Sequence, residues 1–147
     1  MQMTTTTDEN KAVVRRLYEE IDKHNSDVFD ELFAEEYTSG IYRSGSEEAV
    51  DGPAGMKNLM AEYLAAFPDF KGKSMELIAE GNRVAVFREE EGTHEGDFRG
   101  IAPTGDTTTL ESAGYYVIED GEIVHAHLHG NMLNLFKQMG VEVPIPR

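Results

Sequence analysis

The stretch that decides the fold is residues 115–140, which read YYVIEDGEIVHAHLHGNMLNLFKQMG. Apolar and polar residues alternate on both sides of the Glu-Asp-Gly turn at 119–121. A period of two is typical of a strand, and a short turn joins antiparallel neighbours. We therefore predict a pair of antiparallel strands over 106–119 and 122–129.

The same period extends upstream, with strands predicted over 70–80 and 82–91 and a turn at Glu-Gly-Asn between them. The insert 92–105 contains four glycines and a proline, so it is expected to be a long loop that could include a brief strand. Downstream, the spacing predicts a helix over 131–140, with Asn131 as its N-cap and Gly140 after its last turn.

The N-terminal half has a helical period instead. A first helix is predicted over 8–25 and a short second helix after Ser26. A third begins at Pro53 and ends before Pro68, and the polar segment 37–51 between these helices is expected to be a loop or an edge strand. The first helix carries one apolar stripe, made of Val14, Leu17, Tyr18 and Ile21.

Helices followed by a meander and one more helix indicate an α+β fold. We expect a cone-shaped curved antiparallel sheet packed against the N-terminal helices, with a short C-terminal helix. Residues 1–8 are expected to be a flexible tail and 9–147 a single domain, which is an ordinary length for one domain. The mouth of such a cone suits a small-molecule site.

The composition excludes several classes of protein. The chain has 28 acidic and 13 basic residues, for a formal net charge of −15. Such a charge repels nucleic acids and anionic membranes, so neither is expected as a partner. Without cysteine, there can be no disulfide, thiol nucleophile or cysteine-ligated metal. The excess of acid resembles proteins of salt-loving organisms, in which salt screens the repulsion.

Neither a membrane span nor a secretory signal is visible in the sequence. No uncharged apolar run approaches the roughly 18 residues that a span needs. The start, MQMTTTTDENK, lacks the basic and then apolar order of a signal peptide, so a cytoplasmic protein is expected.

Five segments in order resemble the SnoaL-like polyketide (ester) cyclase family. They are ENKAVVRRLYEEI, GPAGMKNLMAEYLAAFPDF, ELIAEGNRVAVF, GTHEGDFRGIAPTG and residues 115–140, so that the likeness covers about 9–140. The resemblance implies the nuclear-transport-factor-2-like cone, a homodimer and a hydrophobic cavity that needs no metal or organic cofactor. One cone hosts cyclases, dehydratases, isomerases and binding proteins, so the fold alone does not fix the reaction.

In the cyclases of this family, an aspartate on the last strand removes the proton α to the carbonyls, and polar groups in the pocket stabilise the enolate. The resemblance, aligned on Asp120-Gly121 and on residues 138–140, implies that Leu128 stands at the position of that aspartate and Asn131 at a second, acidic position. Two polar positions on the preceding strand fall on Ser112 and Gly114. Leucine cannot transfer a proton, so the aldol mechanism of the family's cyclases cannot be assigned to this chain with Leu128 as the base.

Histidines offer one replacement chemistry. His125, His127 and His129 alternate with apolar residues and so share one face of their strand. Since Leu128 is expected in the cup, the row is expected on the convex face, where dimers pack. If a bulge near Gly130 or a change of register turned the row inward, His127 would instead be a general base. As a third alternative, the row would bind a metal ion such as zinc, with His94 as a fourth ligand. His94 either holds the loop 92–105, or it polarises a substrate carbonyl or acts as the base in place of the aspartate.

The strand 82–91 offers a second chemistry. Arg88 and Glu90 share parity with Val84 and Val86, which are expected in the core. Either the strand end emerges into solvent, or the pair lies in the cup with Glu90 as base and Arg88 as an anchor for an anion.

The sequence favours an enzyme that transfers protons in a small apolar carbonyl compound, as lyases and isomerases do. Its catalytic candidates are His94, His127 and Glu90, and its substrate-binding candidates are Tyr18, Tyr63, Arg88, Ser112, Gly114, Tyr116 and Leu128. The alternatives are a non-catalytic binding protein for a hydrophobic small molecule and a structural dimer.

Overall fold

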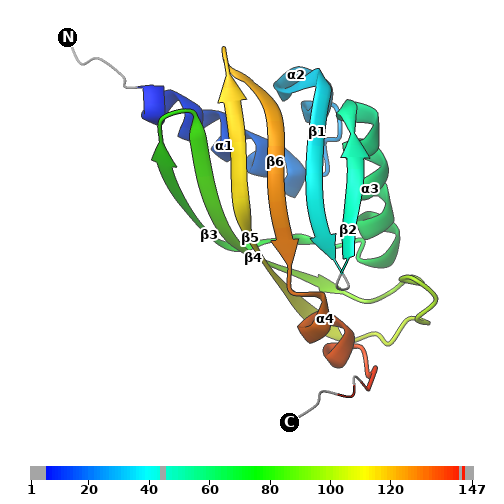
Figure 1. The fold of residues 1–147 in the computed structure, drawn as a ribbon. Helices are drawn as coiled ribbons and strands as arrows, with labels where there is room; N and C mark the ends of the chain where they lie inside the picture. The colour runs from blue at the N-terminus through cyan, green and yellow to red at the C-terminus, as the bar shows by residue number, and fades with distance from the viewer. Residues whose placement is uncertain (1–5, 44–45, 143, 145–147) are drawn as a thin grey trace.

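The structure is a computed structural model that describes residues 6–43, 46–142 and 144. Its centre is one curved sheet of six strands in the order β2-β1-β6-β5-β4-β3, with helices on one face (Figure 1). The strands are β1 (Phe33–Arg43), β2 (Ser46–Asp51), β3 (Lys71–Glu80), β4 (Arg83–Thr93), β5 (Thr107–Glu119) and β6 (Glu122–Gly130). This is the α+β fold that the sequence predicts.

Two helices cover the sheet face that lies behind the strands in Figure 1. The described residues form four helices, α1 (Thr6–Asp22), α2 (Val28–Leu32), α3 (Gly52–Ala66) and α4 (Met132–Gln138), and the two that cover this face are α1 and α3. Helix α1 crosses behind the strands β3 and β4, whereas α3 lies behind β1 and β2. Helix α4 lies beyond the end of β6, and its N-cap Asn131 accepts a hydrogen bond from the backbone N–H of Asn134, as the sequence predicts for a cap.

The segment 37–51 was expected to be a loop or an edge strand, and residues 46–51 do form the edge strand β2. Residues 37–43 instead belong to β1, which pairs with β2 in antiparallel fashion. Strand β1 is an inner strand that pairs in parallel with β6, so the sheet is mixed and not wholly antiparallel. Sequence patterns did not reveal this pairing, because the two strands are about 80 residues apart in the chain and no short turn connects them.

The helix α1 also begins earlier than expected, at Thr6, so residues 6–8 are helical and not a tail. The remainder of the expected tail, residues 1–5, lies outside the described residues. The predicted turns of the meander are confirmed, with Gly81 and Gly121 at positive φ values of 57° and 79°. Glycine adopts this conformation with little steric cost.

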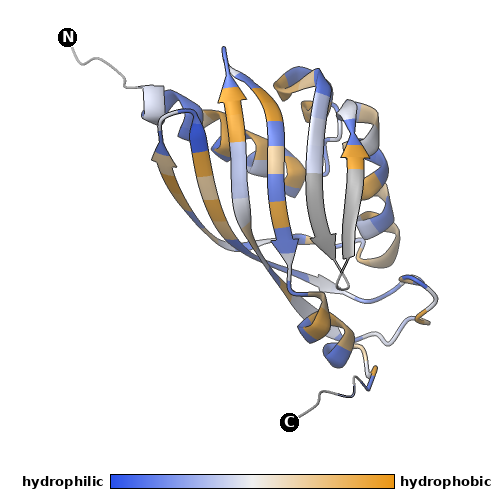
Figure 2. Ribbon diagram, in the orientation of Figure 1, coloured by the Kyte–Doolittle hydropathy of each residue, from blue (hydrophilic) through white to orange (hydrophobic). Residues whose placement is uncertain are grey.

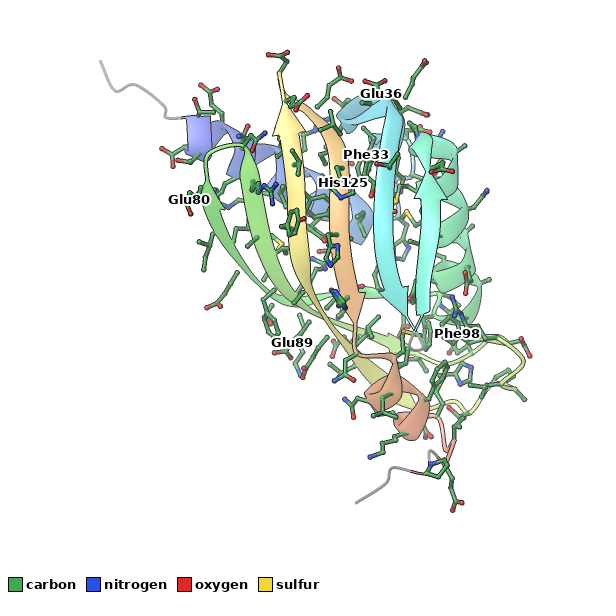
Figure 3. The ribbon with its side chains drawn as sticks, in the orientation of Figure 1. Phe33, Glu36, Glu80, Glu89, Phe98 and His125 are labelled. Atoms are coloured by element: carbon green, nitrogen blue, oxygen red, sulfur yellow. The ribbon has the colours of Figure 1, made fainter. Side chains whose placement is uncertain are left out.

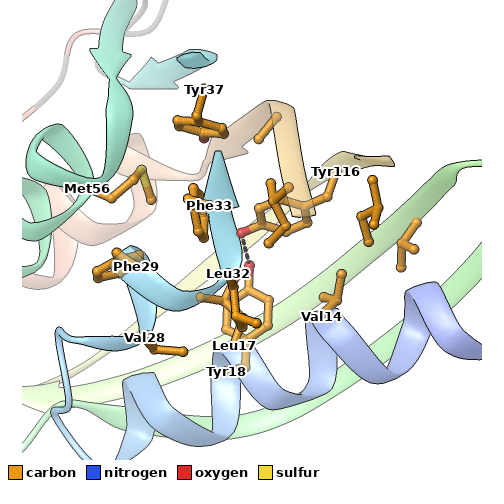
Figure 4. Close-up of a cluster of buried hydrophobic side chains, with 14 of the residues drawn as sticks. Val14, Leu17, Tyr18, Val28, Phe29, Leu32, Phe33, Tyr37, Met56 and Tyr116 are labelled. Atoms are coloured by element: carbon orange, nitrogen blue, oxygen red, sulfur yellow. Dashed lines mark hydrogen bonds between the residues drawn. The ribbon is translucent and has the colours of Figure 1, made fainter. Parts of the chain in front are cut away.

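The core lies between the helices and one face of the sheet (Figure 4). The stripe of α1 is buried there, with Val14 and Leu17 fully inaccessible to solvent. Figure 2 shows the resulting alternation of hydrophobic and hydrophilic residues along the strands. None of the described helices is both long and apolar enough to cross a membrane.

Candidate functional site

The inner face of the sheet is organised as cross-strand rows on β4, β5 and β6. Tyr116 lies between Val84 and Ala126 in the row at one end, where all three side chains are buried. In the next row toward the other end, Gly114 lies between Val86 and Leu128. The row after that places Ser112 between Arg88 and Gly130, and the last places Glu90 beside Leu110. The strands thus bring one glutamate, one serine and one tyrosine to the same wall.

A cavity of about 130 Å³ lies against this wall. Most of its lining is apolar and comes from the helices α1 and α3, the segment around Phe70 and the strands β5 and β6. The lining residues are Tyr18, Ile21, Phe29, Met56, Leu59, Met60, Tyr63, Phe70, Glu90, Leu110, Ser112, Tyr116, Leu128, His129 and Gly130. A narrower recess shares Tyr63, Phe70, Glu90 and Leu110 with this cavity and continues to Leu135 of α4.

Glu90 is the only carboxylic acid among these lining residues. Its side chain is 13% exposed, and its Oε1 lies 3.2 Å from the Nε of Arg88. Burial raises the pKa of the Glu90 carboxyl to about 7, although the positive charge of Arg88 opposes the rise. Near neutral pH this group can therefore both accept and donate a proton.

Two tyrosine hydroxyls meet at the opposite end of the wall. The hydroxyl oxygens of Tyr18 and Tyr116 are 2.7 Å apart, and the rings pack edge to face (Figure 4). Burial raises the pKa of both side chains, so each stays a neutral hydroxyl. A pair of hydroxyls uses only one of its two protons internally, so the second O–H can donate to another group.

Arg88, expected to bind substrate, does not line the cavity. It points inward as its parity predicts and is 2% exposed, but it is turned toward the end of α1, where it donates to Asp22 and contacts the ring of Tyr18. Gly114 is also not a lining residue. A Cβ at this position would lie 2.1 Å from the carbonyl oxygen of His127, so glycine is required for the close approach of β5 and β6.

His94 lies outside the cavity as well. It is fully buried, its ring packs 5.5 Å from that of Phe67, and its Nδ1 accepts a hydrogen bond from the backbone N–H of Thr104. Its backbone also pairs with Asp106 and Gly105 across the base of the loop. These contacts match the first of the two interpretations of this residue, in which it holds the loop 92–105.

The row of histidines lies on the outer face of the sheet, as the parity with Leu128 predicts, although His129 near the end of β6 also borders the cavity. The ring of His127 stacks on Tyr115 with a centroid separation of 5.6 Å, and its Nε2 is 3.1 Å from the Nε2 of His129. Figure 3 shows His125 on the face of the sheet that is turned away from the helices. Within residues 6–43, 46–142 and 144, no three histidine, aspartate or glutamate side chains converge as metal ligands would.

The sequence did not single out two contributions to this site. The helical residues Met56, Leu59 and Met60 carry a clear apolar stripe, which indicates a core face and gives no sign of a cavity. Asp22 holds Arg88 from a position 66 residues earlier in the chain. No local pattern distinguishes this aspartate from the other acidic residues on the surface.

A curved sheet folded over helices around a largely apolar cavity defines a small-molecule-binding protein of the nuclear-transport-factor-2-like class. The chain belongs to the SnoaL-like polyketide cyclase family, whose model matches residues 12–139. No curated protein sequence matches the chain.

Solved structures with the same fold come from several bacteria. AclR of Streptomyces galilaeus, assigned as a hydroxylase, has a TM-score of 0.82 at 24% identity, with 97% of this chain and 91% of that chain covered. An assigned SnoaL-like polyketide cyclase of Jannaschia sp. CCS1 also has a TM-score of 0.82, at 20% identity and with 97% and 100% covered. IdmH of Streptomyces antibioticus has a TM-score of 0.76 at 21% identity, with 90% and 99% covered. At these identities the likeness shows the fold.

Proposed function

We propose that this protein catalyses proton transfer in a small, neutral carbonyl compound, with Glu90 as the general base. The observation that carries the proposal is a buried carboxyl group on the wall of an apolar cavity. A base is most effective when its pKa is close to the working pH. The pKa of Glu90, about 7, meets that condition.

Hydrogen-bond donors for the developing enolate lie on the same wall. Removal of a proton α to a carbonyl places negative charge on the carbonyl oxygen, and neutral donors in a dry site stabilise that charge. The Tyr18 and Tyr116 pair has one hydroxyl proton left to donate, and Ser112 has another. A hydroxyl that accepts one hydrogen bond becomes a stronger donor of the next.

The position of the base differs from that in the family's cyclases. There, an aspartate would project from the position of Leu128 on β6, whereas Glu90 projects from β4, two strands away. Neighbouring strands are about 4.8 Å apart, and Glu90 lies four residues beyond Val86, the residue of β4 in line with Leu128. The base is therefore displaced by about 10 Å across the sheet and by about 13 Å along it. A substrate must therefore lie in the cavity with its acidic C–H toward the β3 and β4 side.

The size and charge of the cavity define the substrate class. A dry cavity of about 150 Å³ in another protein accommodates benzene, so the 130 Å³ of this one suits a single ring or a short branched chain. Arg88 does not line the cavity and is paired with Asp22 and Glu90, so it does not offer its charge to an anion bound there. We therefore assign a neutral compound with an apolar body and one carbonyl end.

His94 and His127 have no part in this chemistry. His94 is buried beside Phe67, and His127 lies against Tyr115 on the outer face. No metal ion or organic cofactor is required for the proposed step, because the carboxylate takes the proton and the hydroxyls stabilise the charge.

The proposal is tested by exchange of α-protons with solvent deuterium. Cyclohexanone, which is neutral and has a single ring, is incubated with the protein in D₂O near pD 7, and the loss of its α-proton signals is followed by NMR. Glu90→Gln should lower the protein-dependent rate by about 10²-fold or more. Glu89→Gln on the outer face of the same strand is the matched control and should leave the rate unchanged. Equal rates for the wild type and Glu90→Gln would overturn the proposal.

A binding protein without turnover is the second candidate, favoured by the apolar Leu128 at the position of the family's base. In that case cyclohexanone perturbs the NMR signals of the lining residues, such as Met60 and Leu128, but its α-protons exchange no faster than in buffer. Binding without exchange would select this function over the enzyme.

We further propose that the chain forms a homodimer through the outer face of the sheet. Two large hydrophobic side chains are exposed there, with Ile78 at 72% and Phe87 at 42%. Light scattering combined with gel filtration tests this, and Phe87→Glu should shift the mass toward that of the monomer. A monomeric wild type would contradict the proposal.

A further inference from the structure

The guanidinium of Arg88 is held by groups from two elements, α1 and β4. Its Nη2 donates to Oδ1 of Asp22 at the end of α1, and its Nε faces Glu90 at 3.2 Å. The ring of Tyr18 lies 4.5 Å from its Cζ, as in a cation–π contact. Arg88 therefore has a fixed position between a surface carboxylate and the carboxyl group of the cavity.

The strand β3 is shaped to leave room for this guanidinium. Gly72 lies opposite Glu90, and Ser74 lies opposite Glu89, so Lys73 is an extra residue in a bulge. A Cβ at Gly72 would lie 2.6 Å from Nη1 of Arg88, so any side chain at this position would require the guanidinium to shift. The backbone N–H of Gly72 also donates to Oδ1 of Asp22 at 2.9 Å, the same oxygen that Arg88 contacts.

We propose that Asp22 and Gly72 are positioning residues that clamp Arg88 against Glu90 and so control when Glu90 can act as a base. Neither touches the cavity, and both act through Arg88. The inference rests on the proposed function only in taking Glu90 as the base. The clamp itself is a feature of the protein without substrate.

The two halves of the clamp have opposite effects on the Glu90 carboxyl. Arg88 stabilises the charged form of Glu90 and lowers its pKa, whereas the negative charge of Asp22 raises it. Asp22 also holds the guanidinium in place. A substitution that removes the charge of Asp22 but keeps the shape of its side chain should therefore lower the pKa of Glu90. A substitution that displaces the guanidinium of Arg88 should raise this pKa.

Other charged or titratable groups face this cluster from each packed element. On α1 they are Arg15, Tyr18 and Glu19, on β3 Lys73 and on β5 Tyr116. The tyrosines are neutral over the relevant range because burial raises the pKa of each. Arg15 and Glu19 are exposed, where solvent and salt screen their charges.

The test is a ¹³C NMR titration of the Glu90 carboxyl in the full chain without ligand, with the signal assigned by its loss in Glu90→Gln. Asp22→Asn keeps the acceptor oxygen but removes the charge, and should lower the pKa of Glu90 by about one pH unit. Gly72→Ala displaces the guanidinium and should raise this pKa by a similar amount. Glu19→Gln, an exposed neighbour on the same helix, should leave it within about 0.2 of the wild type.

A shift of the same sign in both variants, or no shift in either, would overturn the clamp. If Gly72→Ala fails to fold, Arg88→Lys serves in its place. Lysine keeps the charge but lacks the planar fork that reaches two carboxylates at once, so the pKa of Glu90 should rise. If cyclohexanone exchange is absent in the wild type while these shifts occur, the proposed function fails and the clamp stands. If exchange is present, its pH profile should move with the pKa.

Discussion

The hydroxyl oxygens of Tyr18 and Tyr116 lie 2.7 Å apart, so a hydrogen bond joins α1 to β5 across 98 residues of sequence. Both side chains are buried, and both line the cavity. A buried hydroxyl that loses its partner remains desolvated and unpaired, which costs more than the bond itself contributes.

Tyr116→Phe should therefore lower the free energy of unfolding by about 1–3 kcal/mol, because Tyr18 is left unpaired. Urea denaturation measures this. Tyr115→Phe on the outer face is the control and should change stability by less than about 0.5 kcal/mol. The double variant Tyr18→Phe with Tyr116→Phe should lose less than the sum of its single variants, and strict additivity would contradict the pairing.

The raised pKa of Glu90 predicts how stability depends on pH. The folded protein holds this proton up to about pH 7, whereas the unfolded chain releases it near the ordinary pKa of 4.5. The stabilisation from Glu90 is thus fully present below about pH 4.5 and is lost as pH rises through about 7, amounting to roughly 3 kcal/mol.

Denaturation of the wild type and of Glu90→Gln at several pH values isolates this contribution. The stability of the wild type relative to Glu90→Gln should fall between about pH 4.5 and about pH 7. Glu89→Gln should show the same pH dependence as the wild type. A constant difference between the wild type and Glu90→Gln would mean that the carboxyl titrates normally.

Leu128→Asp should introduce a second carboxyl into the cavity wall. Because a buried charge is costly, the variant should be destabilised by about 2–4 kcal/mol at pH 8 and by less at pH 5, where the new group is protonated. Unfolding at the two pH values measures the difference. His127→Asp places the same group on the outer face and should show little dependence on pH, and similar behaviour of the two variants would disprove the assignment of faces.

His94→Ala should loosen the loop 92–105 without removing proton transfer. The substitution leaves a hole beside Phe67 and removes the acceptor for the N–H of Thr104, so a loss of about 2–4 kcal/mol is expected. Hydrogen exchange should accelerate at the amides of His94 and Gly105, which pair across the base of the loop. A fall of about 10²-fold in cyclohexanone exchange, with the fold intact, would instead make His94 part of the mechanism.

The net charge of −15 predicts that added salt stabilises the protein. The excess of like charge opposes the compact state, and the screening length falls from about 10 Å at 0.1 M salt to about 3 Å at 1 M. The midpoint of thermal unfolding should rise over this range of NaCl. A falling midpoint would show that attractive charge pairs, such as Arg16 with Glu31, outweigh the repulsion.

The sequence by itself determined the elements that local geometry controls. The helical stripe around Leu17, the period of two after Phe70 and the turns at Gly81 and Gly121 all depend on residues a few positions apart. Local parity grouped Glu90 with Val84 and Val86, but the sequence left open whether Glu90 points into the cavity or into solvent. The inward orientation of Leu128 was expected from the family resemblance and not from parity alone, and the structure places both side chains on the cavity wall.

Only the tertiary structure decided which of the candidates meet. The parallel pairing of β1 with β6 and the contact between Asp22 and Arg88 join residues that are far apart in the chain. Parity predicted that Arg88 lies on the inner face of the sheet but could not show that Asp22 holds it away from the cavity. Neither the sequence pattern nor the family resemblance predicted that His94 packs against Phe67. Such contacts depend on how whole elements pack, because distance along the chain carries no information about distance in space.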